Sequence, residues 1–128
     1  MSDAMPAILL VDHGSRRDEA NAQLDQLALR VRAARPDLEV RCAHLEIAAP
    51  SVAEALDAYA AEGVREVLIH PFFLAPGRHT SEDLPRLARE AAERNPGLRV
   101  RLGAVLGVDD VVTQAVLARI DAGLRSGD

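Results

Sequence analysis

The chain has 128 residues, a formal net charge of −5 and a pI of about 5.3, a balance that argues against general binding to nucleic acids or anionic membranes. Aromatic residues make up only 2% of the chain, which leaves no platform on which bases could stack. All 15 cationic residues are arginine, and the absence of lysine excludes a Walker-type phosphate-binding lysine and a Schiff-base lysine.

The length corresponds to one domain, so residues 1–128 are predicted to form a single unit with flexible ends at 1–6 and 125–128. Cys42 is the only cysteine, which rules out a disulfide within the chain and favours a small apolar role. No segment approaches the roughly 18 apolar residues of a membrane span. We therefore expect a soluble cytoplasmic protein that binds no nucleic acid and no membrane.

Short apolar segments alternate with longer amphipathic ones along the first half of the chain. Residues 7–11 are uninterruptedly apolar and predict a strand. Residues 16–34 repeat apolar side chains at helical spacing, and residues 38–45 alternate apolar and polar side chains as a half-buried strand does. Ser51 and Glu54 then form a capping box that predicts the start of a second helix.

The second half repeats this alternation. Residues 66–69 predict a strand, residues 71–80 a loop rich in Gly and Pro, and residues 81–94 a helix with Pro85 tolerated in its first turn. Residues 98–106 predict the last strand. A last helix follows, favoured at its start by two aspartates and carrying an apolar stripe expected to face the core, formed by Val112, Val116 and Ile120.

The alternation of strands and helices predicts an α/β fold in three layers, with a four-stranded parallel sheet and helices on both faces. The first and third strands are continuously apolar, as central strands are, whereas the second and fourth alternate as edge strands do. The predicted strand order is therefore 2-1-3-4.

In an open α/β sheet, ligands bind beyond the carboxyl ends of the strands, where the strand order reverses. All four histidines, His13, His44, His70 and His79, lie at or near that predicted edge, and Glu46 follows the second strand. Two imidazoles and one carboxylate suit divalent iron, cobalt, nickel or zinc, and three ligands leave open coordination positions. A neutral histidine is also a proton acceptor near neutral pH.

These residues lie in four segments: LLVDHGSRRDEAN at 9–21, HLEIAAPS at 44–51, HPFFLAPGRHTSEDLP at 70–85 and LGVD at 106–109. With them the sequence resembles the small sirohydrochlorin chelatases, class II tetrapyrrole chelatases of the cobaltochelatase and ferrochelatase kind. The resemblance extends over nearly the whole chain.

The resemblance implies a chelatase-like fold and an ATP-independent enzyme that inserts Co²⁺ or Fe²⁺ into sirohydrochlorin, in cobalamin or siroheme biosynthesis. By the same resemblance, His13 and His79 correspond to the family's metal-binding or proton-accepting histidines, and Glu46 to a carboxylate that contacts the metal. No cofactor is expected to be permanently bound, since the divalent metal (Co²⁺, Fe²⁺ or Ni²⁺) is a substrate. For His44 and His70, the sequence does not decide between a role in the site and a role in the core.

The tetrapyrrole substrate implied by the resemblance carries eight carboxylates, so an acidic protein needs local cations to bind it. Four residues at the predicted mouth are expected to bind the substrate: Ser15, Arg16, Arg17 and Arg78. Arginine suits this task because it contacts a carboxylate through two hydrogen bonds. Longer family members carry two chelatase-like halves, and we therefore expect a homodimer whose cleft lies between the subunits.

Four other functions are alternatives to a chelatase. A phosphohistidine enzyme would carry an arginine immediately before the His-Gly pair, where this chain has Asp12. A flavodoxin-like binding module would need aromatic stacking, and a receiver domain would need a lysine. A non-catalytic metal or tetrapyrrole carrier using the same histidines stays open, because only an assay separates it from a chelatase.

Overall fold

The computed structural model describes residues 5–126 of the chain. A parallel, four-stranded sheet forms its centre, with the strands in the order β2-β1-β3-β4. The strands are β1 (Ala7–Asp12), β2 (Val40–His44), β3 (Glu66–Pro71) and β4 (Arg99–Leu102). The predicted order is confirmed, since the two uninterruptedly apolar strands are the two central ones.

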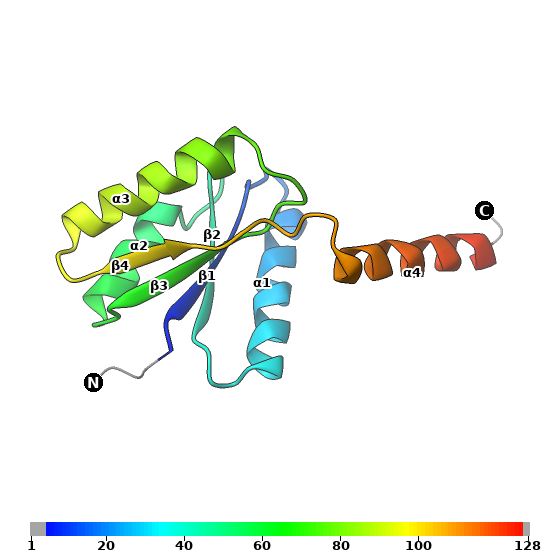
Figure 1. The fold of residues 1–128 in the computed structure, drawn as a ribbon, viewed down its shortest axis with the longest axis horizontal. Helices are drawn as coiled ribbons and strands as arrows, with labels where there is room; N and C mark the ends of the chain where they lie inside the picture. The colour runs from blue at the N-terminus through cyan, green and yellow to red at the C-terminus, as the bar shows by residue number, and fades with distance from the viewer. Residues whose placement is uncertain (1–4, 127–128) are drawn as a thin grey trace.

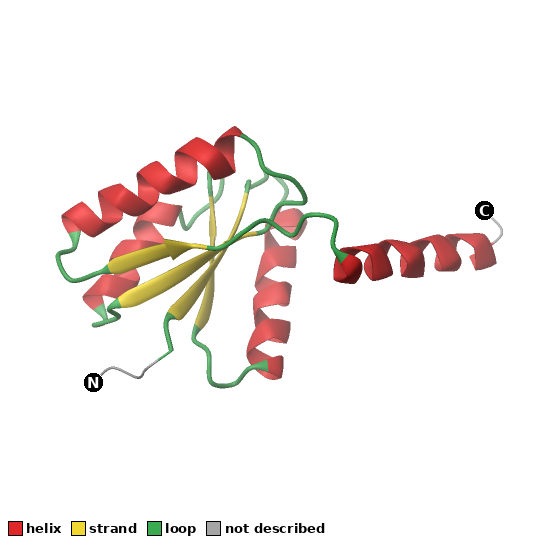
Figure 2. Ribbon diagram, viewed as in Figure 1, coloured by secondary structure: helices red, strands yellow, loops and turns green. Residues whose placement is uncertain are grey.

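The helices are α1 (Asp18–Ala34), α2 (Val52–Ala61), the π-helical turn η1 (His79–Asp83), α3 (Leu84–Arg94) and α4 (Asp110–Ser126). Figure 1 shows α1 on one face of the sheet and α2 with α3 on the other. The same layers appear by element type in Figure 2, where α4 projects away from them. No helix in residues 5–126 combines the length and the apolar character needed to cross a bilayer.

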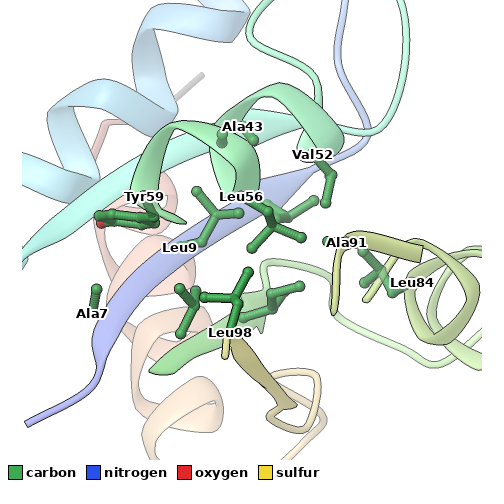
Figure 3. Close-up of a cluster of buried hydrophobic side chains, with 13 residues drawn as sticks. Ala7, Leu9, Ala43, Val52, Leu56, Tyr59, Leu84, Ala91 and Leu98 are labelled. Atoms are coloured by element: carbon green, nitrogen blue, oxygen red, sulfur yellow. The ribbon is translucent and has the colours of Figure 1, made fainter. Parts of the chain in front are cut away.

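The larger core cluster lies between the sheet and the helices α2 and α3 (Figure 3). Leu9, Leu56 and Ile69 are fully buried there, and Tyr59 is buried with its hydroxyl donating a 2.8 Å hydrogen bond to the carbonyl of Ile8. A smaller cluster joins the sheet to α1; its buried members are Leu10, Leu24, Ala28 and Val40. The core is thus almost entirely aliphatic.

Several local predictions are confirmed. The amide of Glu54 donates to Ser51 Oγ at 3.1 Å and the amide of Ser51 donates to Glu54 Oε1 at 2.8 Å, which completes the capping box of α2. Pro85 lies in the first turn of α3. Cys42 is a free, half-buried thiol 3.3 Å from the Leu24 carbonyl, and burial raises its pKa to about 12.

Two predicted boundaries are wrong. The last strand ends at Leu102 rather than at residue 106, because the chain beyond it hydrogen-bonds to the segment after β3 instead of continuing the ladder. Helical backbone begins at His79 rather than at residue 81, so His79 is part of a helical turn and not of a loop. This second shift matters for the site, because a helix holds a side chain more rigidly than a loop does.

The last helix forms as predicted but does not pack on the core. None of the residues of α4 is buried, and its predicted apolar stripe is exposed or partly exposed. Of the ends predicted to be flexible, residues 1–4 and 127–128 lie outside the described residues, whereas Arg125 and Ser126 complete α4.

Candidate metal centre

Three potential metal ligands meet at the carboxyl edge of the sheet. His13 directly follows β1, Glu46 follows β2, and His79 begins η1 after β3. One ligand atom from each of the three lies within 4.8 Å of the others. Glu46 Oε1 is 3.3 Å from His13 Nε2 and 3.9 Å from His79 Nε2. The predicted juxtaposition of two imidazoles and one carboxylate is therefore present.

The two imidazole rings approach edge to face. Their centroids are 4.6 Å apart and their planes form an angle of 74°. Both Nε2 atoms are directed toward the same carboxylate oxygen, so a divalent ion between them could take two nitrogens and an oxygen with little rearrangement. The side chains of His13, Glu46 and His79 are 47%, 52% and 37% exposed, which leaves the remaining coordination positions open to a second ligand.

The backbone brings His13 and Glu46 together through a close approach at Gly14. The amide of Glu46 donates to the His13 carbonyl at 3.0 Å, next to a bond from Leu45 to Asp12. Gly14 has φ +98°, and a Cβ there would lie 1.9 Å from the Glu46 carbonyl oxygen. Only glycine therefore fits this turn, for reasons of both space and conformation.

The loop that carries Glu46 is tightly folded. Ile47 has φ 76°, in the left-handed region that a β-branched residue rarely adopts. The amide of His44 donates to the Pro50 carbonyl and the amide of Ala48 to the Glu46 carbonyl, at 2.9 and 2.8 Å. The surrounding bonds thus hold an unfavourable conformation in place, as is common at functional sites.

His79 is oriented by a neighbour on its own helical turn. Its Nδ1 lies 2.7 Å from Asp83 Oδ2, four residues further along. A carboxylate at this nitrogen favours the tautomer with the proton on Nδ1 and leaves the Nε2 lone pair directed at the site. This arrangement is the usual one for a metal-binding histidine.

A CbiX family model matches residues 7–122 of the sequence. The chain belongs to the CbiX family. It is 36% identical over 113 residues to the chloroplastic sirohydrochlorin ferrochelatase of Arabidopsis thaliana, over 88% of this chain and 50% of that protein. It is 29% identical over 120 residues to the sirohydrochlorin cobaltochelatase of Methanococcoides burtonii, over 88% of this chain and 92% of that protein.

Among solved structures, this CbiX-family fold matches the sirohydrochlorin chelatase SirB of Bacillus subtilis subspecies spizizenii in complex with cobalt. The TM-score is 0.84 at 28% sequence identity, over 92% of this chain and 51% of the SirB chain. The chain therefore spans about half the length of SirB and of the Arabidopsis relative, and nearly the whole of the Methanococcoides one.

The three arginines predicted to bind substrate are close in sequence to the two histidines of the metal-ligand cluster in this CbiX-family chain. Arg16 and Arg17 follow His13, and Arg78 directly precedes His79. Arg16, Arg17 and Arg78 are exposed, and within residues 5–126 their guanidinium groups make no salt bridge and no hydrogen bond. Ser15 is partly buried in the turn, where its Oγ accepts a 3.0 Å hydrogen bond from the Arg17 amide. The three cations are thus available to an anionic ligand.

The other two histidines do not join the cluster. His44 is 3% exposed, and its Nδ1 lies 2.5 Å from Asp12 Oδ1, so it is a buried structural group. His70 lies half-buried beside Phe72, with ring centroids 6.4 Å apart, and burial lowers its pKa. Both histidines lie in register with even-numbered residues of β1, His44 with Asp12 and His70 with Leu10. Leu10 belongs to the core cluster on the α1 side of the sheet.

Sequence reasoning did not assign roles to Asp12 or Asp83, the two carboxylates that hold histidines. The spacing of His79 and Asp83 was available as a signal, since residues four apart meet on one face of a helix. The spacing does not stand out in the sequence, because residues 71–80 are predicted to be a loop. The contact of Asp12 with His44 joins neighbouring strands, and no local pattern reveals it.

Proposed function

We propose that this CbiX-family chain is an ATP-independent chelatase that inserts a divalent metal, Co²⁺ or Fe²⁺, into sirohydrochlorin. The observation that carries the proposal is the cluster of His13, Glu46 and His79, whose ligand atoms lie within 4.8 Å of one another at the carboxyl edge of the sheet. The relatives named as sirohydrochlorin ferrochelatase and cobaltochelatase support the choice of macrocycle.

The reaction exchanges two pyrrole N–H protons of the macrocycle for one M²⁺ and releases two H⁺. We assign His79 as a metal ligand, because Asp83 holds its Nδ1 and directs Nε2 outward. Glu46 lies between the two histidines and can contact the metal or receive a proton from His13, 3.3 Å away. His13, which has no second carboxylate partner within residues 5–126, is the better placed of the two histidines to accept a pyrrole proton.

Substrate binding is assigned to the unpaired cations beside the cluster. Arg16, Arg17 and Arg78 would each contact a peripheral carboxylate of the macrocycle, with Ser15 contributing a hydroxyl. The pairing offsets the charge repulsion that a substrate with eight carboxylates meets on a protein of net charge −5.

The open site also supports a homodimer whose cleft lies between two subunits. All three metal-ligand side chains are more than a third exposed, so one copy of the chain supplies a surface for a flat macrocycle rather than an enclosure. A second copy would supply the opposite wall. We place the reaction in the cytoplasm, in cobalamin or siroheme biosynthesis.

The test is anaerobic incubation of the purified chain with sirohydrochlorin and each of Co²⁺, Fe²⁺ and Ni²⁺, followed by the change in the macrocycle's absorbance. We expect insertion well above the spontaneous rate with Co²⁺ or Fe²⁺, and loss of that excess in the double variant His13→Ala/His79→Ala. His70→Gln is the matched control, because it changes a histidine outside the cluster and should retain activity.

No acceleration with any of the three metals, in protein that is folded and binds the metal, would overturn the proposal. A protein that binds Co²⁺ or the macrocycle without joining them would instead be the carrier considered above.

A further inference from the structure

The turn between β1 and α1 is held by a side chain that comes from the helix itself. The amide of Ser15 donates a 2.9 Å hydrogen bond to Asn21 Oδ1, and Asn21 Nδ2 donates a 2.8 Å hydrogen bond to the Ser15 carbonyl. Within residues 5–126 neither of these backbone groups has a backbone partner. The side-chain amide of Asn21 therefore fixes the whole peptide backbone of Ser15.

The helix α1 begins without a side-chain cap of its own. Arg17 occupies the N-cap position and makes no capping hydrogen bond, although serine, threonine, aspartate and asparagine are the favoured residues there. Cations are also unfavourable at this end of a helix, because they face the positive end of its dipole. The start of α1 is held instead through Ser15, whose Oγ accepts a 3.0 Å hydrogen bond from the Arg17 amide.

Asparagine is an unexpected residue at position 21. It lies one turn inside α1, where asparagine is a poorer helix former than alanine, glutamine or glutamate. Its side chain is partly buried, and both of its polar atoms are used on Ser15. Asn21 is also the last residue of the segment LLVDHGSRRDEAN, and the proposed function gives it no role. Its contacts indicate that it orders the turn rather than the helix.

The ordered turn carries three consecutive side chains that can bind an anion. They are Ser15, Arg16 and Arg17, which we call the 15–17 turn, and they begin two residues after His13. The Ser15 hydroxyl accepts from the Arg17 amide, and within residues 5–126 it donates its own proton to no protein atom. The two guanidinium groups are likewise unpaired there. A carboxylate accepts several hydrogen bonds, so one carboxylate can use donors from more than one of these side chains.

We propose that Asn21 is a positioning residue for substrate binding. By fixing the backbone of Ser15, it holds the 15–17 turn in the shape that receives a peripheral carboxylate of the macrocycle. A turn that is ordered before the ligand arrives loses less conformational entropy on binding, and the complex is tighter for that reason. The inference deepens the substrate binding of the proposed function and rests on it.

The metal ligands do not depend on this clamp. The carbonyl of His13 accepts a 3.0 Å hydrogen bond from the Glu46 amide, and the adjacent Gly14 lies against the Glu46 carbonyl. These contacts join the end of β1 to the loop after β2 and do not involve Asn21. Loss of the Asn21 side chain should therefore loosen the 15–17 turn while the metal ligands stay in place.

The first experiment measures two affinities of the full chain separately. Sirohydrochlorin binding without metal is followed by absorbance titration, and Co²⁺ binding without macrocycle by calorimetry. Asn21→Ala should weaken macrocycle binding by about tenfold, the cost of ordering roughly one backbone residue on binding. Its Co²⁺ affinity should stay close to that of the wild type.

Gln23→Ala is the matched control, because it removes an exposed amide side chain two residues further along α1. Both of its affinities should be unchanged. Alanine is a better helix former than asparagine or glutamine, so both variants should fold, which circular dichroism checks.

The second experiment tests whether Asn21 acts through the arginines. The effect of Asn21→Ala on macrocycle binding is measured again in an Arg16→Ala/Arg17→Ala background. Most of the loss should disappear there, because the cations that Asn21 positions are absent. A general weakening of the fold would instead lower the affinity by the same factor in both backgrounds.

Unchanged macrocycle binding in Asn21→Ala would overturn the proposal, and so would an equal loss in both backgrounds or a parallel loss of Co²⁺ affinity. A wild type that binds no sirohydrochlorin would overturn both this inference and the proposed function. Neither experiment measures metal insertion. Macrocycle binding that depends on Asn21 in a protein without insertion activity therefore refutes only the proposed function, and an active chelatase that is insensitive to Asn21→Ala refutes only the positioning role.

Discussion

Asp83 holds His79 from one helical turn away, with Oδ2 2.7 Å from Nδ1, and thereby directs the opposite nitrogen of the ring toward Glu46. Because a carboxylate behind a metal-binding histidine fixes its tautomer and the orientation of its ring, Asp83→Ala should weaken Co²⁺ binding by about 10–100-fold. Asp83→Asn, which retains an acceptor oxygen, should lose less. Calorimetric titration with Co²⁺ measures both.

Glu82→Ala is the matched control for this prediction, since it removes an exposed carboxylate from the same turn and should leave the affinity unchanged. Equal affinities for Asp83→Ala and the wild type would show that His79 needs no support from Asp83.

The contact between Gly14 and the Glu46 carbonyl predicts a severe effect of a single methyl group. Gly14→Ala would place a Cβ 1.9 Å from that oxygen at φ +98°, and should lower the free energy of unfolding by more than about 2 kcal/mol. Urea denaturation measures the loss. Gly63→Ala isolates the conformational part, because Gly63 has φ +90° with nothing within 4 Å of the added Cβ, and should cost only about 1 kcal/mol. Similar losses for the two variants would contradict the steric argument.

Alanine variants of His13 and His44 should have opposite effects, one on metal binding and the other on stability. His13→Ala removes one of the three metal ligands, so Co²⁺ affinity should collapse. Because the side chain is about half exposed, the free energy of unfolding should change by less than about 0.5 kcal/mol. His44→Ala removes a buried group bonded to Asp12 and should lower the free energy of unfolding by about 1–3 kcal/mol. Its metal affinity, measured where the variant is fully folded, should stay within a few-fold of the wild type. Loss of metal binding in His44→Ala with unchanged stability would reverse the two assignments.

The burial of His70 should make the stability of the folded chain depend on pH. Burial lowers the pKa of His70 in the folded chain, so the unfolded chain binds the proton more tightly. The unfolded state therefore carries more protons between the folded pKa and the ordinary value near 6.5, and stability falls as the pH drops through that window. Thermal unfolding from pH 7.5 to 5 should show a smaller decrease in Tm for His70→Gln than for the wild type. An equal decrease in both would show that other groups govern this range.

Local sequence patterns were sufficient for most of the fold. The continuous apolar runs at Ala7–Val11 and Val67–Ile69 identify the central strands, and the capping box of Ser51 with Glu54 identifies the start of α2. These signals act over a few residues, so they can be recognised before the chain is folded. The boundaries of β4 and of the helix at His79 depended on hydrogen bonds from other segments and were placed wrongly.

The alternation of strands and helices is enough to predict that histidines and a glutamate gather at one edge of a parallel sheet, because strand order and direction bring the carboxyl ends of strands together. The folded chain is needed to see that His13 and His79 meet at Glu46 while His44 is buried against Asp12, since side-chain direction depends on register and on the turn at Gly14. The direction of α4 was equally undetermined. An apolar pattern specifies that a helix must be covered, but the hydrogen-bonded course of residues 103–109 specifies where it points.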